Sequence, residues 1–282
     1  MTAPPRLSAA LRGATAGPRP HTLEARWLAA YAAGLGESDP RFYDPTAPGG
    51  PIVHPLFPVC YEWPLAVELR ERAIGAAVAS LGVHLIHDLA LHRPPRAGER
   101  VVTTARVTDV MPHRAGTLVV VEFATVDAAG DPVSTTRYGS LYRGVTLDGA
   151  AAAAPPPRPP APAAPVWQEP VAIAAGAAHV YTECARIWNP IHTDPAAARA
   201  AGLPAIVLHG TATLALAVSR VVARDLGGEA SAVRGVRARF TGLVTLPSTL
   251  VVRGRGRRGA EILFDAVDGG GRPVLGEGAV LA

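Results

Sequence analysis

Residues 181–210 read YTECARIWNPIHTDPAAARAAGLPAIVLHG, and this stretch brings two histidines, two X-Pro turn signals and a His-Gly pair into one span. A residue before proline is pushed out of the helical region, so Asn189-Pro190 is predicted to end a helix over 177–188. His192 then lies on a turn, and Asp194-Pro195 begins a second helix with Asp194 as its N-cap. Polar residues this dense between apolar segments indicate a functional site.

A long apolar helix is predicted directly after this stretch. Gly202 ends the preceding helix, and residues 205–208 form a short extended run that leads into His209-Gly210. Residues 211–226 contain neither Gly nor Pro and are apolar nearly all round, which is typical of a buried helix. The first N–H groups of a helix have no acceptor within it and lie at its positive end, so Gly210 is a candidate oxyanion donor.

The order and spacing of Asn189-Pro190-Ile191-His192, Asp194-Pro195 and Ile206-Val207-Leu208-His209-Gly210 resemble the hydratase motif of the MaoC-like enoyl-thioester hydratases and dehydratases. The resemblance implies the α+β class and a double hot-dog fold, in which each of two repeats wraps a long helix in an antiparallel sheet. It also implies an acyl substrate carried as a coenzyme A or carrier-protein thioester. In that family an Asp and the motif His act as a general acid/base pair.

The chain departs from the family pattern at the acid. The family usually has Ser-Gly-Asp before Asn-Pro-x-His, whereas this chain has Ala185-Arg186-Ile187. Isoleucine can neither accept a proton nor orient a water, and a positioned acid or base contributes roughly 100- to 10,000-fold to a rate. Two interpretations stay open: the chemistry has been rebuilt around His192 with another polar partner, or the site binds an acyl thioester and does something other than hydration.

An internal repeat relates the start of the chain to the central stretch. The matching pairs are Tyr31 and Tyr181, Asp39-Pro40 and Asn189-Pro190, and Asp44-Pro45 and Asp194-Pro195. In this register Glu37 takes the place of Ile187, and Phe42 takes the place of His192. Each half therefore keeps one member of an acid/histidine pair. A helix over 23–36 precedes the first copy.

Short β-rich runs follow a second long helix pattern at 57–79, and similar runs follow the central stretch. Pro, Gly and Asp turn residues separate them, which is typical of antiparallel strands. The runs lie at 84–93, 100–110, 117–133 and 134–145, and then at 233–246, 248–256, 260–269 and 272–282. We divide the chain into an N-terminal hot-dog repeat with a degenerate motif (1–148), a Pro/Ala-rich linker expected to be extended (149–166), and a C-terminal repeat that carries the motif (167–282). The two repeats are expected to share one continuous sheet.

Composition narrows the class of protein. The chain of 282 residues is 49% hydrophobic and can bury one large core or two ordinary ones. It lacks an apolar run of the roughly 18 residues that a membrane span needs and an apolar signal core, so a cytoplasmic protein without a membrane partner is expected. Every basic residue is arginine, which excludes Schiff-base chemistry on lysine.

Neither a cofactor nor a metal is predicted. No Gly-rich phosphate loop is present, and the two cysteines, Cys60 and Cys184, lack metal-ligand spacing. The odd-even spacing of His84, His87 and His92 would scatter them over both faces of a strand. The arginines are scattered apart from a run at 253–258, so nucleic acid is not an expected partner. That run is either a solvated hairpin or a patch for the phosphates of a carrier group.

Eight residues are candidates for the site. The catalytic candidates are His192 as the base, Gly210 as the oxyanion donor and Glu183 as the carboxylate nearest to Ile187 in sequence; the substrate-binding candidates are Asn189, Ile187, His209, Glu37 and His54. The structural alternatives are that His192 pins the turn, that Asn189 bonds the local backbone and that Glu183 is solvated. Because His192 is expected on a turn with little core contact, its replacement by Ala should cost about 1 kcal/mol or less.

The leading prediction is a hydro-lyase with an atypical active site, which interconverts enoyl and 3-hydroxyacyl thioesters in lipid or secondary metabolism, or a lyase-like variant of it. The alternatives are a non-catalytic acyl-thioester-binding subunit and a hot-dog thioesterase. The expected partner is an acyl-CoA or acyl-carrier-protein thioester. Exposed sheet edges suggest a homodimer.

Overall fold

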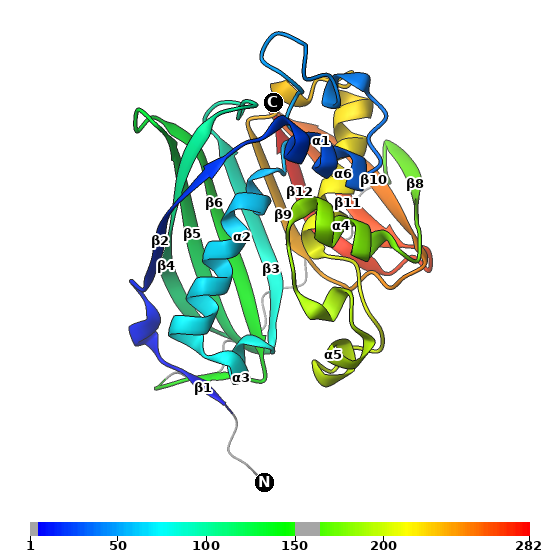
Figure 1. Cartoon of the computed structure of the whole chain (residues 1–282). Helices are drawn as coiled ribbons and strands as arrows, with labels where there is room; N and C mark the ends of the chain where they lie inside the picture. The colour runs from blue at the N-terminus through cyan, green and yellow to red at the C-terminus, as the bar shows by residue number, and fades with distance from the viewer. Residues whose placement is uncertain (1–4, 150–163) are drawn as a thin grey trace.

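One antiparallel sheet runs through the described chain, residues 5–149 and 164–282 of the computed structural model (Figure 1). Its strand order is β2-β4-β5-β6-β3-β9-β12-β11-β10-β8. The first half supplies β2 (Thr15–Thr22), β3 (Gly82–Leu91), β4 (Arg100–His113), β5 (Gly116–Asp127) and β6 (Pro132–Arg143). The second half supplies β8 (Trp167–Ile173), β9 (Gly235–Phe240), β10 (Ser248–Arg258), β11 (Glu261–Asp268) and β12 (Pro273–Leu281). The short strands β1 (Arg6–Leu7) and β7 (Thr146–Leu147) pair with each other outside this sheet.

Strands β3 and β9 join the two halves of the sheet. They pair antiparallel from Ile86 opposite Arg239 to Ala90 opposite Gly235. The Leu91 N–H extends this seam by donating to the Arg234 carbonyl at 2.8 Å. The predicted continuous antiparallel sheet is therefore confirmed, whereas the proposed domain boundaries stay predictions.

Each half-sheet curves around one long helix, α2 (Pro58–Leu69) in the first half and α6 (Gly210–Asp225) in the second (Figure 1). The shorter helices are α1 (Ala25–Gly34), α3 (Ala76–Ala79), α4 (Ala177–Ala185) and α5 (Pro195–Ala200). Helix α6 buries residues on most of its sides, as its apolar sequence predicts. The helix predicted at 57–79 is not continuous, because a π-helical turn over 70–74 follows α2 and ends at Gly75, whose φ of 84° is incompatible with helix; α3 begins after it.

The outermost strands β2 and β8 were not predicted. Both contain proline, at Pro18 and Pro20 in β2 and at Pro170 in β8, which argues against a strand in a sequence but is tolerated at a sheet edge. Strand β8 begins directly after the predicted linker, and most of that linker lies outside the described residues. The arginine run proves to be the end of β10 at its hairpin with β11, where Arg253 donates to Asp265 at 2.7 Å.

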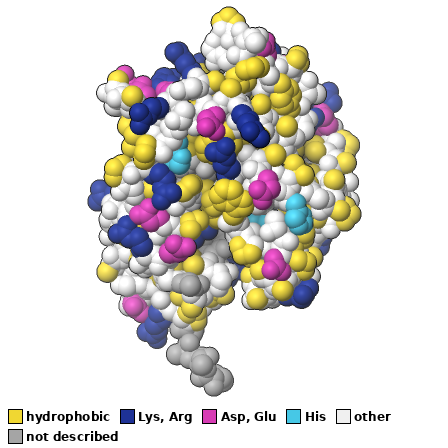
Figure 2. All heavy atoms as spheres, in the orientation of Figure 1, with side chains coloured by type: hydrophobic (Ala, Val, Ile, Leu, Met, Phe, Trp, Pro, Cys, Tyr) yellow, Lys and Arg dark blue, Asp and Glu magenta, His cyan; other side chains and the backbone are white. Residues whose placement is uncertain are grey.

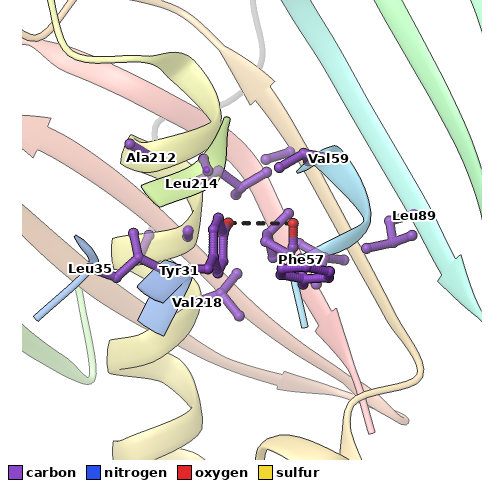
Figure 3. Close-up of a cluster of buried hydrophobic side chains, with 14 of the residues drawn as sticks. Tyr31, Leu35, Phe57, Val59, Leu89, Ala212, Leu214 and Val218 are labelled. Atoms are coloured by element: carbon purple, nitrogen blue, oxygen red, sulfur yellow. Dashed lines mark hydrogen bonds between the residues drawn. The ribbon is translucent and has the colours of Figure 1, made fainter. Parts of the chain in front are cut away.

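The two halves share a core where α1 packs against α4. The fully buried hydroxyls of Tyr31 and Tyr181, which match in the repeat, lie 3.4 Å apart. Gly34 is required at this contact, because a Cβ there would lie 2.8 Å from the Cβ of Cys184. Figure 3 shows Tyr31 and Phe57 of the first half beside Leu214 and Val218 of α6. This mixed cluster indicates one cooperative folding unit.

Charged side chains of both signs are interspersed on the molecular face shown in Figure 2, with apolar side chains between them. This face therefore has no patch of a single charge. Among the described helices, none combines the length and the apolar character required to cross a membrane.

Candidate active site

A cavity of about 130 Å³ lies between the central motif and the first half of the chain. Five of the predicted residues line it: Ile187, Asn189, His192, His209 and Gly210. The opposite wall comes from α2, β3, β5 and β6. The structure thus brings one contiguous sequence motif against residues that lie far from it in the chain.

Two side-chain caps fix the turn that carries His192. Asn189 caps the 3-10 turn Pro190–His192, and its Oδ1 accepts a hydrogen bond from the Ile191 N–H at 3.5 Å. Asp194 then caps α5, with Oδ1 2.7 Å from the Ala196 nitrogen. Because both ends of the turn are held, the His192 side chain is directed inward and is only 9% exposed. The expectation that His192 contributes little to the core is wrong.

The Nδ1 atom of His192 lies 2.8 Å from the Val207 carbonyl oxygen. A carbonyl can only accept, so Nδ1 carries the proton and Nε2 keeps its lone pair. Burial lowers the pKa of His192 to about 4, partly offset by this hydrogen bond. At neutral pH His192 is therefore a neutral imidazole with an unprotonated Nε2, which is the form a general base needs.

His209 stacks on His192, with ring centroids 3.7 Å apart and planes inclined by 25°. Its Nε2 lies 3.3 Å from the Ile187 carbonyl and 3.2 Å from Thr182 Oγ1, so this nitrogen carries the proton. Burial, and then the neighbouring His192, lower the pKa of His209 well below its usual value. His209 therefore acts as a neutral platform that holds the His192 ring in place.

Helix α6 begins at Gly210, and its first residues lie at the cavity. Gly210 and Thr211 both line it, and the first-turn N–H groups of a helix have no intrahelical acceptor. A Cβ at position 210 would lie 3.2 Å from Phe240 Cε1, so glycine permits close packing of the helix start against β9. The Tyr181 hydroxyl donates to Thr211 Oγ1 at 3.1 Å and ties this turn to α4.

Three predicted residues lie elsewhere. Glu183 is exposed on α4 and is absent from the described lining of the cavity. Glu37 and His54 line a second cavity of about 140 Å³, together with Ser219. There the Leu56 N–H donates to His54 Nδ1, so the ring proton is on Nε2. This Nε2 lies 3.1 Å from Ser219 Oγ, and the Ser219 hydroxyl donates to Glu37.

This second cavity is the counterpart of the first in the internal repeat. Phe42 lines it in the place that His192 takes in the central motif, so it has an acid but no motif histidine. Glu37 and His54 were candidates for substrate binding, but they lie in this second cavity and not in the cavity of His192. They form a separate buried hydrogen-bonded group.

Four polar residues of the opposite wall were not predicted as site residues: Glu62, Arg70, His84 and Tyr138. Glu62 is the only carboxylate among the described residues that line the cavity. It is 3% exposed, and its Oε1 accepts a hydrogen bond from Thr136 Oγ1 at 2.6 Å. Burial raises the pKa of Glu62 to about 8, so its carboxyl is neutral at pH 7.

The sequence contained a pattern that could have predicted that Glu62 and Arg70 lie together. Glu62 and Arg70 are eight positions apart in the predicted long helix, a spacing that places them on one face. The histidines of β3 were misjudged for a different reason. A bulge between His84 and Ile86 shifts the alternation, so the rings of His84 and His87 lie 5.4 Å apart on the same face.

Two family models match the chain, one in each half. A MaoC like domain matches residues 160–264, and a FAS1-like, dehydratase domain region matches residues 10–136. The chain is similar to the 3-hydroxyacyl-thioester dehydratase X of Mycobacterium tuberculosis, with 29% identity over 206 residues that cover 71% of this chain and 67% of that protein. Its match to the enoyl-CoA hydratase ChsH3 of the same organism is 42% identical over 64 residues, covering 23% of this chain and only 22% of that protein.

Solved structures establish the fold. A MaoC-like dehydratase from Phytophthora capsici superposes with a TM-score of 0.81 at 24% identity, covering 96% of this chain and 95% of that one. A Mycobacterium tuberculosis protein described as having a double hotdog fold superposes with a TM-score of 0.59 at 18% identity, covering 96% of both chains. The fold is therefore the double hot dog, as predicted.

Proposed function

We propose that the chain, which matches a MaoC like domain in its second half and a FAS1-like dehydratase domain region in its first, interconverts an enoyl thioester and its 3-hydroxyacyl thioester. One observation carries the proposal: His192 presents an unprotonated Nε2 in a cavity that the start of α6 also lines. A base and an oxyanion donor are the two groups that addition of water to an enoyl thioester requires.

In the hydration direction, water attacks C3 while its proton passes to His192 Nε2. The C2=C3 electrons move toward the thioester carbonyl, whose oxygen becomes negative. The Gly210 N–H donates to that oxygen at the positive end of α6. The imidazolium then returns its proton to C2, which gives the 3-hydroxyacyl thioester and restores the neutral histidine. Dehydration follows the same steps in reverse.

This single-base route accounts for Ile187. The residue lines the cavity and is 3% exposed, so it has the position of the family acid without its chemistry. His192 must then handle the proton in both steps. Burial disfavours the imidazolium, but the enolate that forms beside it supplies a compensating negative charge.

The substrate is proposed to be an acyl-CoA or acyl-carrier-protein thioester. The names of the two Mycobacterium tuberculosis relatives, an enoyl-CoA hydratase and a 3-hydroxyacyl-thioester dehydratase, support that class. The cytoplasmic location and the homodimer expected from the sequence stay predictions.

The direct test is incubation with a crotonyl thioester and with its 3-hydroxy product, for wild type, His192→Ala and the exposed control His92→Ala. We expect reversible turnover in wild type and in the control, and a loss of roughly 100-fold or more in His192→Ala. Release of free thiol would instead identify a thioesterase. Binding without turnover in wild type would identify a non-catalytic acyl-thioester-binding subunit. Either of these results would overturn the proposal.

A further inference from the structure

The wall of the cavity opposite the central motif carries two ionisable residues, Glu62 and Arg70. The stripe that lines the cavity consists of Val59, Glu62, Trp63 and Ala66 of α2 and of Arg70, which begins the π-helical turn after α2. From the helical rise, Arg70 lies about 12 Å along the axis from Glu62. Ligand pockets are lined mainly by apolar side chains, and their few polar groups set orientation and specificity. The two ionisable residues on this stripe are therefore expected to determine which ligands the cavity binds.

Neighbouring side chains hold Arg70 in place, and no carboxylate of the described residues pairs with it. Its Nη2 donates to the Tyr138 hydroxyl at 3.0 Å, and its guanidinium carbon lies 4.8 Å from the centre of the Trp63 ring. Within residues 5–149 and 164–282, no carboxylate oxygen approaches the Arg70 guanidinium to 4.0 Å. The guanidinium also interacts with the Tyr142 hydroxyl, where it acts to lower a pKa that burial raises. These contacts leave N–H groups of the guanidinium for a further acceptor.

The neighbours of Arg70 leave its charge uncompensated. Glu62 is the only carboxylate on the described lining; it is bonded to Thr136 and is neutral at pH 7. His84 stacks on Tyr138 with ring centroids 3.9 Å apart and interacts with the Ile86 carbonyl through Nε2 at 3.0 Å, so that nitrogen carries the proton. Tyr138 accepts from Arg70, which leaves its own hydroxyl proton for another acceptor.

We propose that this wall recognises an acyl chain that ends in a carboxylate, with Arg70 and the Tyr138 hydroxyl as its donors. The inference rests on the proposed function, because it places the thioester at His192 and the acyl chain along α2. Arg and carboxylate form paired, charge-assisted hydrogen bonds that few neutral groups can replace. An apolar tail would instead leave the buried side of Arg70 without a partner, and a site built for a polar group rejects analogues that lack it.

The test compares binding of saturated thioesters, which cannot be hydrated. Calorimetric titration of wild type with hexanoyl-CoA and adipoyl-CoA, and with shorter and longer matched pairs, measures the preference for a terminal carboxylate at each chain length. The monomethyl ester of the preferred member separates charge from polarity. We expect the carboxylate-ended member of one pair to bind at least about 10-fold tighter than its apolar match, and its ester to lose that advantage.

Arg70→Met keeps an unbranched stem over Trp63 and removes the charge. We expect it to abolish the preference, because the carboxylate-ended thioester should bind more weakly than in wild type and the apolar thioester as tightly or more tightly. Arg72→Met is the matched control, since Arg72 lies on the exposed side of the same segment and pairs with Glu68 at 2.7 Å. It should retain the preference. Thermal unfolding of both variants checks that they are folded, and Arg70→Lys, which restores a positive charge, should recover part of the preference.

Equal binding of both members of every pair in wild type would overturn the inference. So would an equal loss for both members in Arg70→Met, because Arg70 would then contact the phosphates or another part of the carrier that they share. The proposed hydratase activity is judged separately, with the corresponding enoyl thioesters. A binding preference without turnover would overturn that activity alone, and turnover without a preference would overturn the inference alone.

Discussion

The His192 ring is held from two sides, by the Val207 carbonyl at 2.8 Å and by the His209 ring at 3.7 Å. His192→Ala removes both contacts and leaves a buried carbonyl unpaired, so we expect it to lower the free energy of unfolding by about 1–3 kcal/mol. His192→Gln keeps a side-chain N–H that can donate to Val207 and should cost less. Both variants lack the imidazole base and should lose roughly 100-fold or more in turnover.

Urea unfolding and turnover, measured on the same preparations, separate the two roles of His192. If His192→Gln is inactive but nearly as stable as wild type, the loss of rate is due to the missing imidazole base and not to unfolding. Full turnover in His192→Gln would mean that the base lies elsewhere, and Glu62 would then be the first residue to examine, as the only carboxylate on the described lining.

Ile187→Asp restores the acid of the family motif at a position that the structure places on the cavity wall. We expect hydration of a simple enoyl thioester to rise, toward the roughly 100-fold lower limit for a positioned acid or base. The side chain is 3% exposed, so burial will raise the pKa of the new carboxyl and lower the stability. Ile187→Asn is the control, because it has nearly the same shape and no acid. Equal rates for the two variants would show that the cavity has been remodelled beyond this residue.

The residues of the site differ in how far the sequence alone predicts them. His192, Asn189 and Gly210 belong to one continuous motif whose turn and helix signals are local, so their shared cavity could be anticipated. Arg70 and Tyr138 are 68 positions apart and meet only because the π-helical turn after α2 lies beside β6. No local pattern encodes that contact, so this half of the cavity required the fold.

At the scale of the element, the start of α6 connects helix packing to chemistry. Gly210→Ala would place a Cβ 3.2 Å from Phe240, and the first turn would have to move by a few tenths of an ångström. We expect turnover to fall about 10-fold or more, because oxyanion donors act only at close range. Stability should change little, since Ala is a better helix former than Gly.

Phe240→Leu tests whether crowding against Phe240 causes the loss of turnover expected in Gly210→Ala. In the double variant with Gly210→Ala, the smaller side chain should relieve the crowding and restore part of the rate. Steady-state kinetics of the two single variants and the double variant form the measurement. An additive loss in the double variant would contradict steric displacement of the helix start.

Element boundaries show where local rules stop. The apolar pattern over 57–79 continues past Leu69, but Gly75 with its positive φ interrupts the helical backbone between the π-helical turn and α3. Strands β2 and β8 carry prolines and polar residues, so they lack the alternation that marks a strand. They become strands because each caps one end of the sheet, a condition that depends on the assembled fold.

At the scale of the whole molecule, the two repeats are joined by their sheet, their helices and their core. The β3–β9 seam, the contact of Gly34 with Cys184 and the Tyr31–Tyr181 pair all cross between the halves. The packing residues Tyr31 and Tyr181 match in the two repeats, whereas the two cavities differ in their polar residues. One cavity has a motif histidine without its acid, and the other has Glu37 without that histidine.

Buried histidines in both halves make stability depend on pH. Burial lowers the pKa of each of five histidines: His54, His84, His87, His192 and His209. A histidine that the fold keeps neutral costs nothing above its unfolded pKa of 6.5, and it destabilises the fold as the pH drops toward its folded pKa. Glu62 acts in the opposite direction, because its folded pKa of about 8 exceeds the usual 4.5 and stability falls as pH rises between them.

His87 isolates the acid side of this profile. It is fully buried, neither ring nitrogen has a hydrogen-bond partner among the described residues, and burial lowers its pKa to about 4. We expect urea unfolding of wild type to show stability falling from pH 6.5 toward 4, with each such histidine contributing roughly 1.4 kcal/mol per pH unit at most. His87→Leu removes one contribution and should give a shallower fall and a more stable protein at pH 5, whereas the exposed His92→Gln should keep the wild-type profile. If stability fell with pH as steeply in His87→Leu as in wild type, His87 would have the same pKa in the folded and unfolded protein. The first half of the core would then admit water.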